Sequence, residues 1–413
     1  MSNDRRSDEA DDSERRGAAD PLPGPPQPWA ATSMPSRRSG PPFHMTDMIA
    51  AEPHVARRIL DRLAESGGSG GSGGSATRLA ASVRDTATRA KPIVVTGCGT
   101  SEHGALGIVE ILRDAMRTAG LPGPGPMNAQ AFEAALEPQE GGLLIAVSHE
   151  GATGATNRAM AAARDAGATV ALVTVSDRSP GARSADIVLA TGELDASWCH
   201  TVGYLSPLIA ATTVADALND RASDPAAIEA LLADGLTSAD EATAVASALA
   251  GTARLLVTAS GADRPAGREL TLKIEEAAWI PTAYRDLETL LHGHLPATDG
   301  STGLVLILTD RAARTARVAR ARQALAAADA IGIRAAAIVS AEVSADLPIA
   351  ATPAGRIVVA EAPTIPASVA ALLGSAIPLQ LLTERIARVR GTDPDPIRRD
   401  DPRYLAAADA AEG

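Results

Sequence analysis

Two long stretches of this chain follow one pattern, in which short apolar runs alternate with alanine-rich helical segments. The apolar runs lie at 93–95, 143–147, 170–175 and 187–189 in the first stretch, and at 255–257, 304–308, 335–339 and 357–359 in the second. Apolar runs that alternate with helices predict a parallel sheet with helices on both faces. Two stretches of about 140 residues each fit two α/β domains better than one very large sheet.

Helices are predicted between and around these runs, at 45–63, 76–90, 105–119, 154–166, 205–218 and 368–388. Apolar residues make up 45% of the chain, but aromatic residues make up only 2%. The cores must therefore be built from Ala, Leu, Val and Ile, and such a composition favours helices and buried parallel strands over an aromatic-rich β-sandwich.

Changes in composition mark the predicted domain boundaries. The tail over 1–43 is dense in Asp, Arg, Ser and Pro and is predicted to be disordered. Two helices follow over 44–90, joined by the flexible connector SGGSGGSGGS. We expect a first α/β domain over 91–247, a second over 248–390 and a C-terminal tail over 391–413.

The charge and cysteine content exclude several classes of protein. A net charge of −12 repels phosphate backbones and argues against a nucleic-acid partner, although anionic small molecules could still bind at helix N-termini. Cys98 and Cys199 form neither a disulfide framework nor a zinc motif. We expect no membrane span, because no apolar stretch approaches about 18 residues, and no signal peptide, because the N-terminus is polar. The predicted location is the cytoplasm, and no cofactor is predicted.

Two strand-to-helix turns in the first domain have the composition of ligand-binding turns. They read VTGCGTS over 95–101 and VSHEGAT over 147–153. Glycine lets the backbone approach a ligand, and free N–H groups at a helix N-terminus favour anions. The Ser and Thr residues could instead be simple N-caps, so a structural reading stays open. Neither turn matches the dinucleotide or P-loop motif.

Taken together, GCGTS and SHEGAT resemble the SIS (sugar isomerase) domain. More narrowly, residues 45–413 resemble the isomerase half of glucosamine-6-phosphate synthase. Further landmarks occur in that family's order and spacing: LKIEE at 272–276 with Trp279 and Ile280, LHGHL at 291–295, IPLQLL at 377–382 and RGTD at 390–393. This resemblance implies two tandem SIS domains, each a mostly parallel, flavodoxin-like sheet flanked by helices.

The resemblance also implies a sugar or sugar-phosphate ligand in the first domain. The residues expected to bind it are Cys98, Gly99, Thr100, Ser101, Ser148, His149, Glu150, Thr153 and His200. Where the family has a phosphate-binding serine, this chain has Glu150. Two like charges about 4 Å apart cost about 1 kcal/mol in water and more when partly buried. Either Glu150 points away from the ligand, or the ligand is less anionic than a sugar phosphate; an amine-bearing ligand would suit a carboxylate.

Lys273 and Glu276 are three residues apart, so they share one face of a helix. A surface ion pair is the simple alternative. However, the chain contains only two lysines, Lys91 and Lys273, against thirty-six arginines. A lysine is expected where its amine must act as a nucleophile or acid. The resemblance implies that Lys273 contacts the open-chain sugar near its carbonyl end and that Glu276 moves a proton between adjacent carbons.

His292 corresponds by resemblance to a ring-opening histidine that reaches into the neighbouring subunit's site, which implies a homodimer. A loop-capping histidine is the alternative. His292 and His294 could suggest a metal pair, but two ligands alone are a weak signal, and no metal is predicted. Trp198, Cys199 and His200 are expected at the pocket mouth. We expect no thiol nucleophile there, because no third orienting group is visible.

Two departures from the synthase affect the expected reaction. No cysteine precedes Cys98, so glutaminase activity is not expected, and the tail after residue 390 contains no lysine. Arg399 or Arg403 could clamp a ligand but could not exchange protons. Three hypotheses remain: an isomerase or deglycase acting on an amino sugar or fructosamine, a glutamine-independent glucosamine-6-phosphate synthase, and a non-catalytic sugar sensor.

Overall fold

The computed structural model describes residues 35–65 and 74–412. Most of the predicted Gly/Ser connector and residues 1–34 of the predicted disordered tail lie outside the described residues. Residues 35–43, by contrast, contact the folded body. Phe43 is buried, and Arg37 forms an ion pair with Asp400 at 3.1 Å. This short stretch therefore packs against the body, because it contains an apolar anchor that its polar composition obscured.

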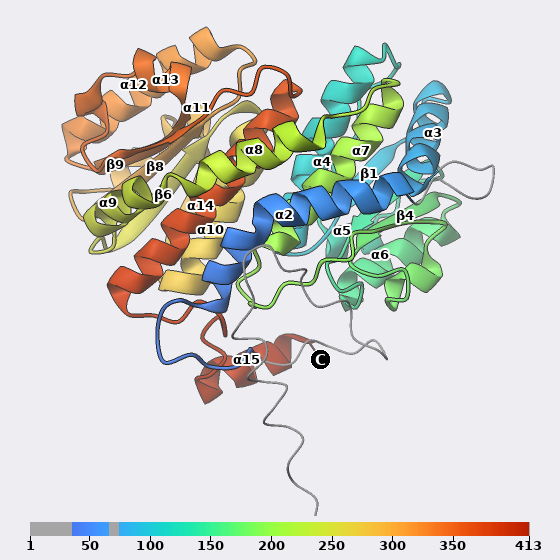
Figure 1. Cartoon of the computed structure of the whole chain (residues 1–413), viewed down its shortest axis with the longest axis horizontal. Coiled ribbons are helices and arrows are strands. Elements are labelled where there is room, and N and C mark those ends of the chain that lie inside the picture. The colour runs from blue at the N-terminus through green and yellow to red at the C-terminus, as the bar shows by residue number, and fades with distance from the viewer. Residues whose placement is uncertain (1–34, 66–73, 413) are drawn as a thin grey trace, which may run out of the picture.

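The described residues form two five-stranded sheets, and all neighbouring strands in them pair in parallel (Figure 1). The first has the order β2-β1-β3-β4-β5 and the second the order β10-β9-β8-β6-β7. The strands are β1 (Ile93–Thr96), β2 (Met127–Asn128), β3 (Leu143–Val147), β4 (Thr169–Thr174), β5 (Ile187–Ala190), β6 (Arg254–Ala259), β7 (Thr282–Asp286), β8 (Thr302–Leu308), β9 (Arg334–Ser340) and β10 (Arg356–Val359).

Each sheet has the flavodoxin-like strand order 2-1-3-4-5, counted within its own domain. All eight strands predicted from apolar runs are confirmed. The sequence analysis missed β2 and β7, which are both edge strands. β2 has only two residues, and every residue of β7 is half-buried, so neither carries a continuous apolar run.

Helices cover both faces of each sheet. They are α2 (His44–Glu65), α3 (Ser75–Thr88), α4 (Thr100–Thr118), α5 (Ala131–Leu136), α6 (Gly154–Asp165), α7 (Val202–Leu218), α8 (Pro225–Leu236), α9 (Ala239–Leu249), α10 (Arg264–Ala278), α11 (Leu287–Leu290), α12 (Arg314–Ile331), α13 (Ala341–Asp346), α14 (Ala367–Arg390) and α15 (Pro402–Glu412). The six helices predicted from the sequence are confirmed, with ends that differ by a few residues.

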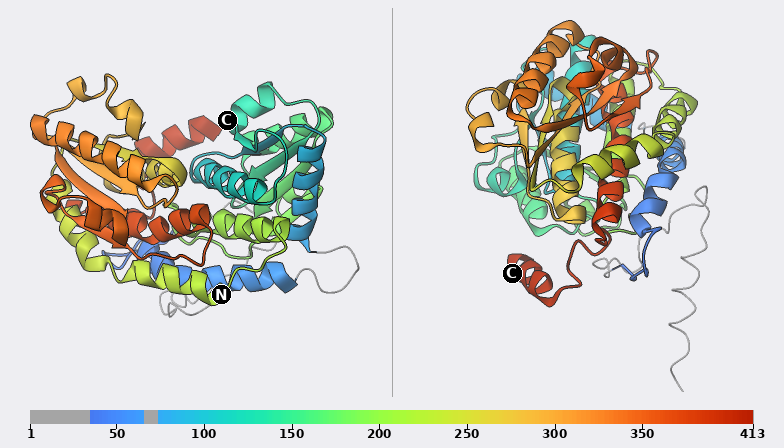
Figure 2. Two further views of the ribbon diagram at one scale, coloured as in Figure 1. Left: turned by 90° about the horizontal axis from the view of Figure 1, so that it is seen from above. Right: turned by 90° about the vertical axis from the view of Figure 1, so that its left-hand side faces the viewer.

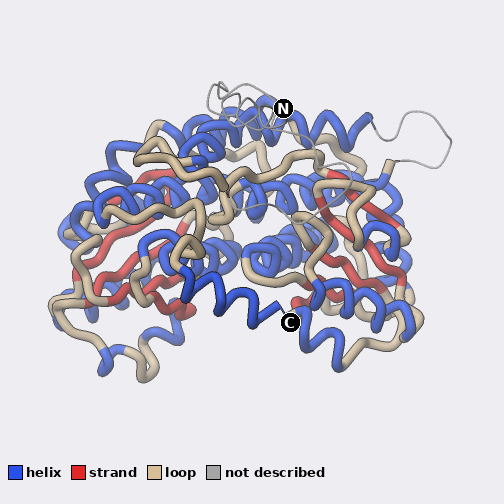
Figure 3. The backbone as a smooth tube through the Cα atoms, turned by 90° about the horizontal axis from the view of Figure 1, so that it is seen from below, coloured by secondary structure: helices blue, strands red, loops and turns tan. Residues whose placement is uncertain are grey.

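The inner helices of the two domains pack against one another between the sheets, which lie at opposite ends of the molecule in Figure 3. α4 contacts β1 and β3 of the first sheet, whereas α10 contacts β6 and α14 contacts β9 and β10 of the second. Across the domains, α4 contacts α10 and α14, and α7 contacts α14. Figure 2 shows α15 apart from both sheets, beyond the end of α14. The shared core is therefore helical and sits where the two domains meet.

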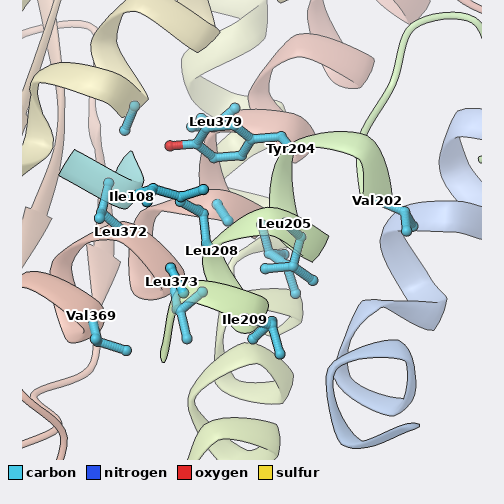
Figure 4. Close-up of a cluster of buried hydrophobic side chains, with 14 of the residues drawn as sticks. Ile108, Val202, Tyr204, Leu205, Leu208, Ile209, Val369, Leu372, Leu373 and Leu379 are labelled. Carbon is cyan, nitrogen blue, oxygen red and sulfur yellow. The ribbon is translucent and has the colours of Figure 1, made fainter. Parts of the chain in front are cut away.

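α7 and α14 form the centre of this core. Leu205 and Leu208 of α7 pack near Leu372 and Leu373 of α14, with Ile108 of α4 beside them (Figure 4). α14 is long and apolar enough to cross a membrane by length and composition, but 94% of its most apolar window is buried inside the protein. The same length and apolarity fit the core helix that it is here.

Candidate functional site

The two predicted ligand-binding turns lie side by side at one edge of the first sheet. β1 leads into α4 through the first turn, β3 leads into α6 through the second, and β1 pairs directly with β3. A side chain at Gly97 would bring a Cβ within 2.6 Å of the backbone carbonyl carbon of Ser101. Gly99 has a φ of 56°, which favours glycine. These glycines therefore allow the close approach to the backbone of Ser101 and the positive φ that the turn requires, and the approach to a ligand stays a prediction.

Hydroxyl groups line these turns. The Ser148 and Thr153 hydroxyls lie 3.2 Å apart, and the Cys98 sulfur lies 3.7 Å from the Thr156 hydroxyl. Burial raises the pKa of Cys98 and, more strongly, that of Cys199. Burial therefore favours the neutral thiol at both positions.

Lys273 is buried on α10 between two carboxylates. Its Nζ lies 2.6 Å from Oε2 of Glu276 and 3.7 Å from Oε1 of Glu269. Burial alone lowers the pKa of Lys273, but Glu276 and Glu269 outweigh it and raise that pKa above the ordinary lysine value. Lys273 is therefore held as a cation, so its geometry favours charge stabilisation over the neutral nucleophile that the sequence analysis considered.

Glu269 links α10 to the first ligand turn. Its Oε1 accepts a hydrogen bond from the Thr100 hydroxyl at 3.3 Å, and its Oε2 lies 2.7 Å from Nδ1 of His103. Thr100 and His103 are one turn apart at the start of α4. A Cβ placed on Gly99 would also lie 4.0 Å from the side chain of Leu272 on α10. The first turn and the Lys273 cluster are therefore parts of one site between the two domains.

The segment before α7 brings the ring of His200 close to that of His149 in the second turn. The rings of His149 and His200 lie 5.1 Å apart, tilted by 50°. Burial lowers the pKa of His149 to about 4, and burial with the neighbouring His149 and Lys273 lowers that of His200. Both rings are therefore neutral near pH 7. The backbone N–H of Asp195 donates to Nε2 of His149 at 3.0 Å, so His149 carries its proton on Nδ1.

Asp195 organises the start of α7. Its Oδ2 accepts the backbone N–H groups of Thr201 at 2.7 Å and Gly203 at 3.0 Å. Burial raises the pKa of Asp195 to about 6, although these hydrogen bonds oppose the shift. The carboxyl thereby fixes the segment that carries Cys199 and His200.

His292 lies elsewhere in this chain. Its side chain is 67% exposed, and its Nε2 lies 2.7 Å from Glu288, which also pairs with Arg320. Its role in a neighbouring subunit stays a prediction. Nδ1 of His294 accepts a hydrogen bond from Arg285 at 3.0 Å. Within residues 35–65 and 74–412, no group of three His, Cys, Asp or Glu side chains could hold a metal ion.

The C-terminal tail approaches the site through stacked arginines. The Arg399 guanidinium lies 5.2 Å from the ring centre of Trp198, next to Cys199. Arg398, which the sequence analysis missed, lies 4.3 Å from the ring centre of Trp279. Arg403 instead pairs with Asp401 at 2.7 Å on an exposed surface. Of the two predicted clamps, Arg399 therefore contacts the segment that was predicted to line the pocket mouth, and its role as a clamp stays a prediction.

Residues 88–219 match the family model of the SIS domain. The first α/β domain is a SIS domain. No curated protein matches the chain.

Solved structures share the fold of both domains. The C-terminal domain of glucosamine-fructose-6-phosphate aminotransferase from Francisella tularensis is 20% identical, with a TM-score of 0.71 over 87% of this chain and 99% of that one. Tagatose-6-phosphate ketose/aldose isomerase from Escherichia coli is 16% identical, with a TM-score of 0.68 over 88% of this chain and 98% of that one. Glucosamine-6-phosphate deaminase from Thermotoga maritima is 15% identical, with a TM-score of 0.54 over 82% and 96%. The fold of two α/β domains expected from the sequence agrees with these matches, and the family model covers the first of them.

Sequence reasoning missed three residues around the SIS domain's ligand turns: His103, Asp195 and Glu269. Glu269 carried one usable signal, because it lies four residues before Lys273 and shares its helical face. His103 meets Glu269 across 166 residues of chain. Such a long-range pair needs the packing of α4 on α10, which no local pattern supplies.

Proposed function

We propose that this protein is a sugar isomerase or deglycase that acts on an amino sugar or a fructosamine, with Glu276 as the proton-moving group. The observation that carries the proposal is the Glu276 carboxylate, held 2.6 Å from the buried Lys273 ammonium beside the SIS domain's ligand turns. Similarity in fold to a ketose/aldose isomerase and to a sugar-phosphate aminotransferase domain supports the same class of chemistry.

The arrangement suits an aldose–ketose interconversion. The Glu276 carboxylate takes a proton from the carbon next to the carbonyl, and the electron pair moves onto the carbonyl oxygen to give an enediolate. The Lys273 cation stabilises that developing negative charge. The proton of the adjacent hydroxyl then moves to this oxygen, and Glu276 returns its proton to the former carbonyl carbon. A new carbonyl forms at the adjacent carbon, so no proton or electron is gained or lost. A carboxylate that is 21% exposed, against 1% for Lys273, can reach both a substrate and its ammonium partner.

The proposed ligand carries an amine rather than relying on phosphate alone. Glu150 follows β3 in the second ligand turn, directly after His149 in sequence. A carboxylate at that position disfavours a dianionic phosphate and favours an ammonium group. Amino sugars and fructosamines supply such a group next to the carbon that isomerises.

A ligand screen with hexose phosphates, amino-sugar phosphates and fructosamines tests this proposal. A ligand at about 100 times its Kd should stabilise the protein by about 3 kcal/mol in thermal unfolding. Each binding ligand is then incubated in deuterium oxide, and NMR follows exchange at its C1 and C2. We expect exchange in the wild type and a loss of at least about 100-fold in Glu276→Gln. Tight binding without any exchange would favour a sensor and contradict the proposal.

A further inference from the structure

His103 is the histidine best placed to move a proton within the same chain as Lys273 and Glu276. His149 and His200 are kept neutral by burial, and Nε2 of His149 is taken by a backbone N–H. His292 is exposed and paired with Glu288. His103, by contrast, lies 2.7 Å from the same Glu269 that borders the Lys273 ammonium.

The contact with Glu269 fixes how His103 presents its ring. Glu269 is buried and faces the Lys273 ammonium, so its carboxylate accepts the hydrogen bond and Nδ1 of His103 donates it. The second ring nitrogen, Nε2, is then the basic one. The His103 side chain keeps 14% of its surface exposed, whereas that of Glu269 keeps 1%. A buried carboxylate behind a partly exposed imidazole is the arrangement that orients a general base.

We propose that His103 and Glu269 form a dyad that opens the cyclic sugar within the same chain; this inference rests on the proposed function. Nε2 of His103 takes the proton from the anomeric hydroxyl, and the bond between the anomeric carbon and the ring oxygen breaks. The imidazolium, stabilised by Glu269, then gives the proton to the ring oxygen. The products are the open-chain carbonyl sugar and a neutral imidazole, so the proton count is unchanged. Glu276 acts on the open chain that results.

A purely structural role is the competing explanation, because His103–Glu269 also joins α4 to α10. The chain offers a matched control for that role. Arg264 of α10 pairs with Glu110 of α4 at 2.9 Å, and Arg264 is 45% exposed. Glu110→Gln therefore weakens a contact between the same two helices without touching the Lys273 cluster. His103→Gln keeps a side-chain N–H that can donate to Glu269 but cannot exchange a proton.

The test uses the full chain and measures anomer interconversion, which reports ring opening directly. Glucosamine 6-phosphate, fructose 6-phosphate and fructosamine serve as probes, and magnetisation-exchange NMR gives the rate at which their α and β forms interconvert. Deuterium exchange at C1 and C2 is read from the same samples. We expect wild-type protein and Glu110→Gln to accelerate anomer interconversion of at least one probe. His103→Gln should lose at least about 100-fold of that acceleration, and Glu269→Gln should also lose it.

Glu276→Gln separates this inference from the proposed function. It should keep the anomer interconversion and lose the deuterium exchange, so the two readouts fail independently. The dyad is overturned if wild-type protein leaves anomer interconversion at its spontaneous rate, or if His103→Gln retains the wild-type rate. A loss in His292→Ala with full retention in His103→Gln would likewise overturn it and assign ring opening to the neighbouring subunit. If thermal unfolding shows that His103→Gln is not folded, the rate of anomer interconversion in Glu269→Gln decides the question instead.

Discussion

The two sheets have the same strand order, yet their carboxyl-terminal edges are built for different purposes. In the SIS domain, the turns after β1 and β3 carry hydroxyls, such as those of Ser148 and Thr153, which we propose bind the ligand. In the second domain, the turns after β6 and β8 are filled by the chain itself. Asp263 is fully buried there and accepts the backbone N–H groups of Thr309 at 2.7 Å and Asp310 at 2.9 Å.

Arg317 also occupies the carboxyl-terminal edge of the second sheet. It pairs with Asp310, whose carboxylate also accepts the backbone N–H of Ala262 at 2.9 Å. The Arg317 guanidinium occupies the space that a Cβ on Gly261 would need. In this domain, backbone N–H groups that could bind an anion therefore donate to the carboxylates of Asp263 and Asp310 instead. In the proposed function, the second domain acts instead through later turns of α10, which carry Glu269, Lys273 and Glu276.

Asp263→Ala gives the largest effect expected from this comparison. It leaves the buried N–H groups of Thr309 and Asp310 without an acceptor, so we expect a loss of about 3 kcal/mol in the free energy of unfolding. Because the substitution is remote from the ligand turns, the Kd of any ligand found in the screen should change by less than about twofold. Urea unfolding and calorimetric titration measure the two quantities. A large loss of affinity would mean that the second edge also binds ligand.

The stability that Asp263 contributes at the carboxyl-terminal edge of the second sheet should also depend on pH. Burial raises the pKa of Asp263 from 3.8 to about 6, although hydrogen bonds from Thr309 and Asp310 oppose the shift. As the pH rises, the unfolded chain loses this proton first, so the wild type loses stability between pH 3.8 and about 6. Asp263→Asn removes that loss. Its unfolding free energy relative to wild type should therefore rise by up to about 3 kcal/mol across this window. A constant difference would show that Asp263 titrates normally.

In the ligand turns of the SIS domain, by contrast, substitutions should change ligand affinity more than stability. The double substitution Ser148→Ala and Thr153→Val removes two hydroxyls that form a hydrogen bond with each other. Stability should therefore change by less than about 1 kcal/mol, whereas the Kd of the ligand should rise about tenfold through lost hydrogen bonds. Ser238→Ala, whose hydroxyl donates within the chain to Gly235 at 2.7 Å, is a control outside the site. Unchanged ligand affinity in the double variant would remove these hydroxyls from the site.

The sequence predicted those parts of the molecule whose structure follows from a local residue pattern, such as an apolar run or helical spacing. Buried central strands such as β3 and β8 are continuous apolar runs, and Lys273 and Glu276 meet because helical spacing brings them together. The edge strand β7 was missed because one face of an edge strand can stay polar. The His103–Glu269 contact was missed because it depends on packing between domains. The spacing of Lys273 and Glu276 also left the cationic state of Lys273 undetermined, since burial and the added carboxylate of Glu269 decide it.

The central claim is that Glu276, beside Lys273 and the SIS domain's ligand turns, moves the substrate proton. The neighbouring Glu275 supplies the sharpest comparison, because it lies on the same helix but is exposed and accepts the backbone N–H of Thr282 at 3.1 Å. Solvent deuterium exchange into a bound sugar should be measured for Glu276→Gln and Glu275→Gln under identical conditions. The account predicts near wild-type exchange in Glu275→Gln and its loss in Glu276→Gln. Equal exchange in both variants would contradict it.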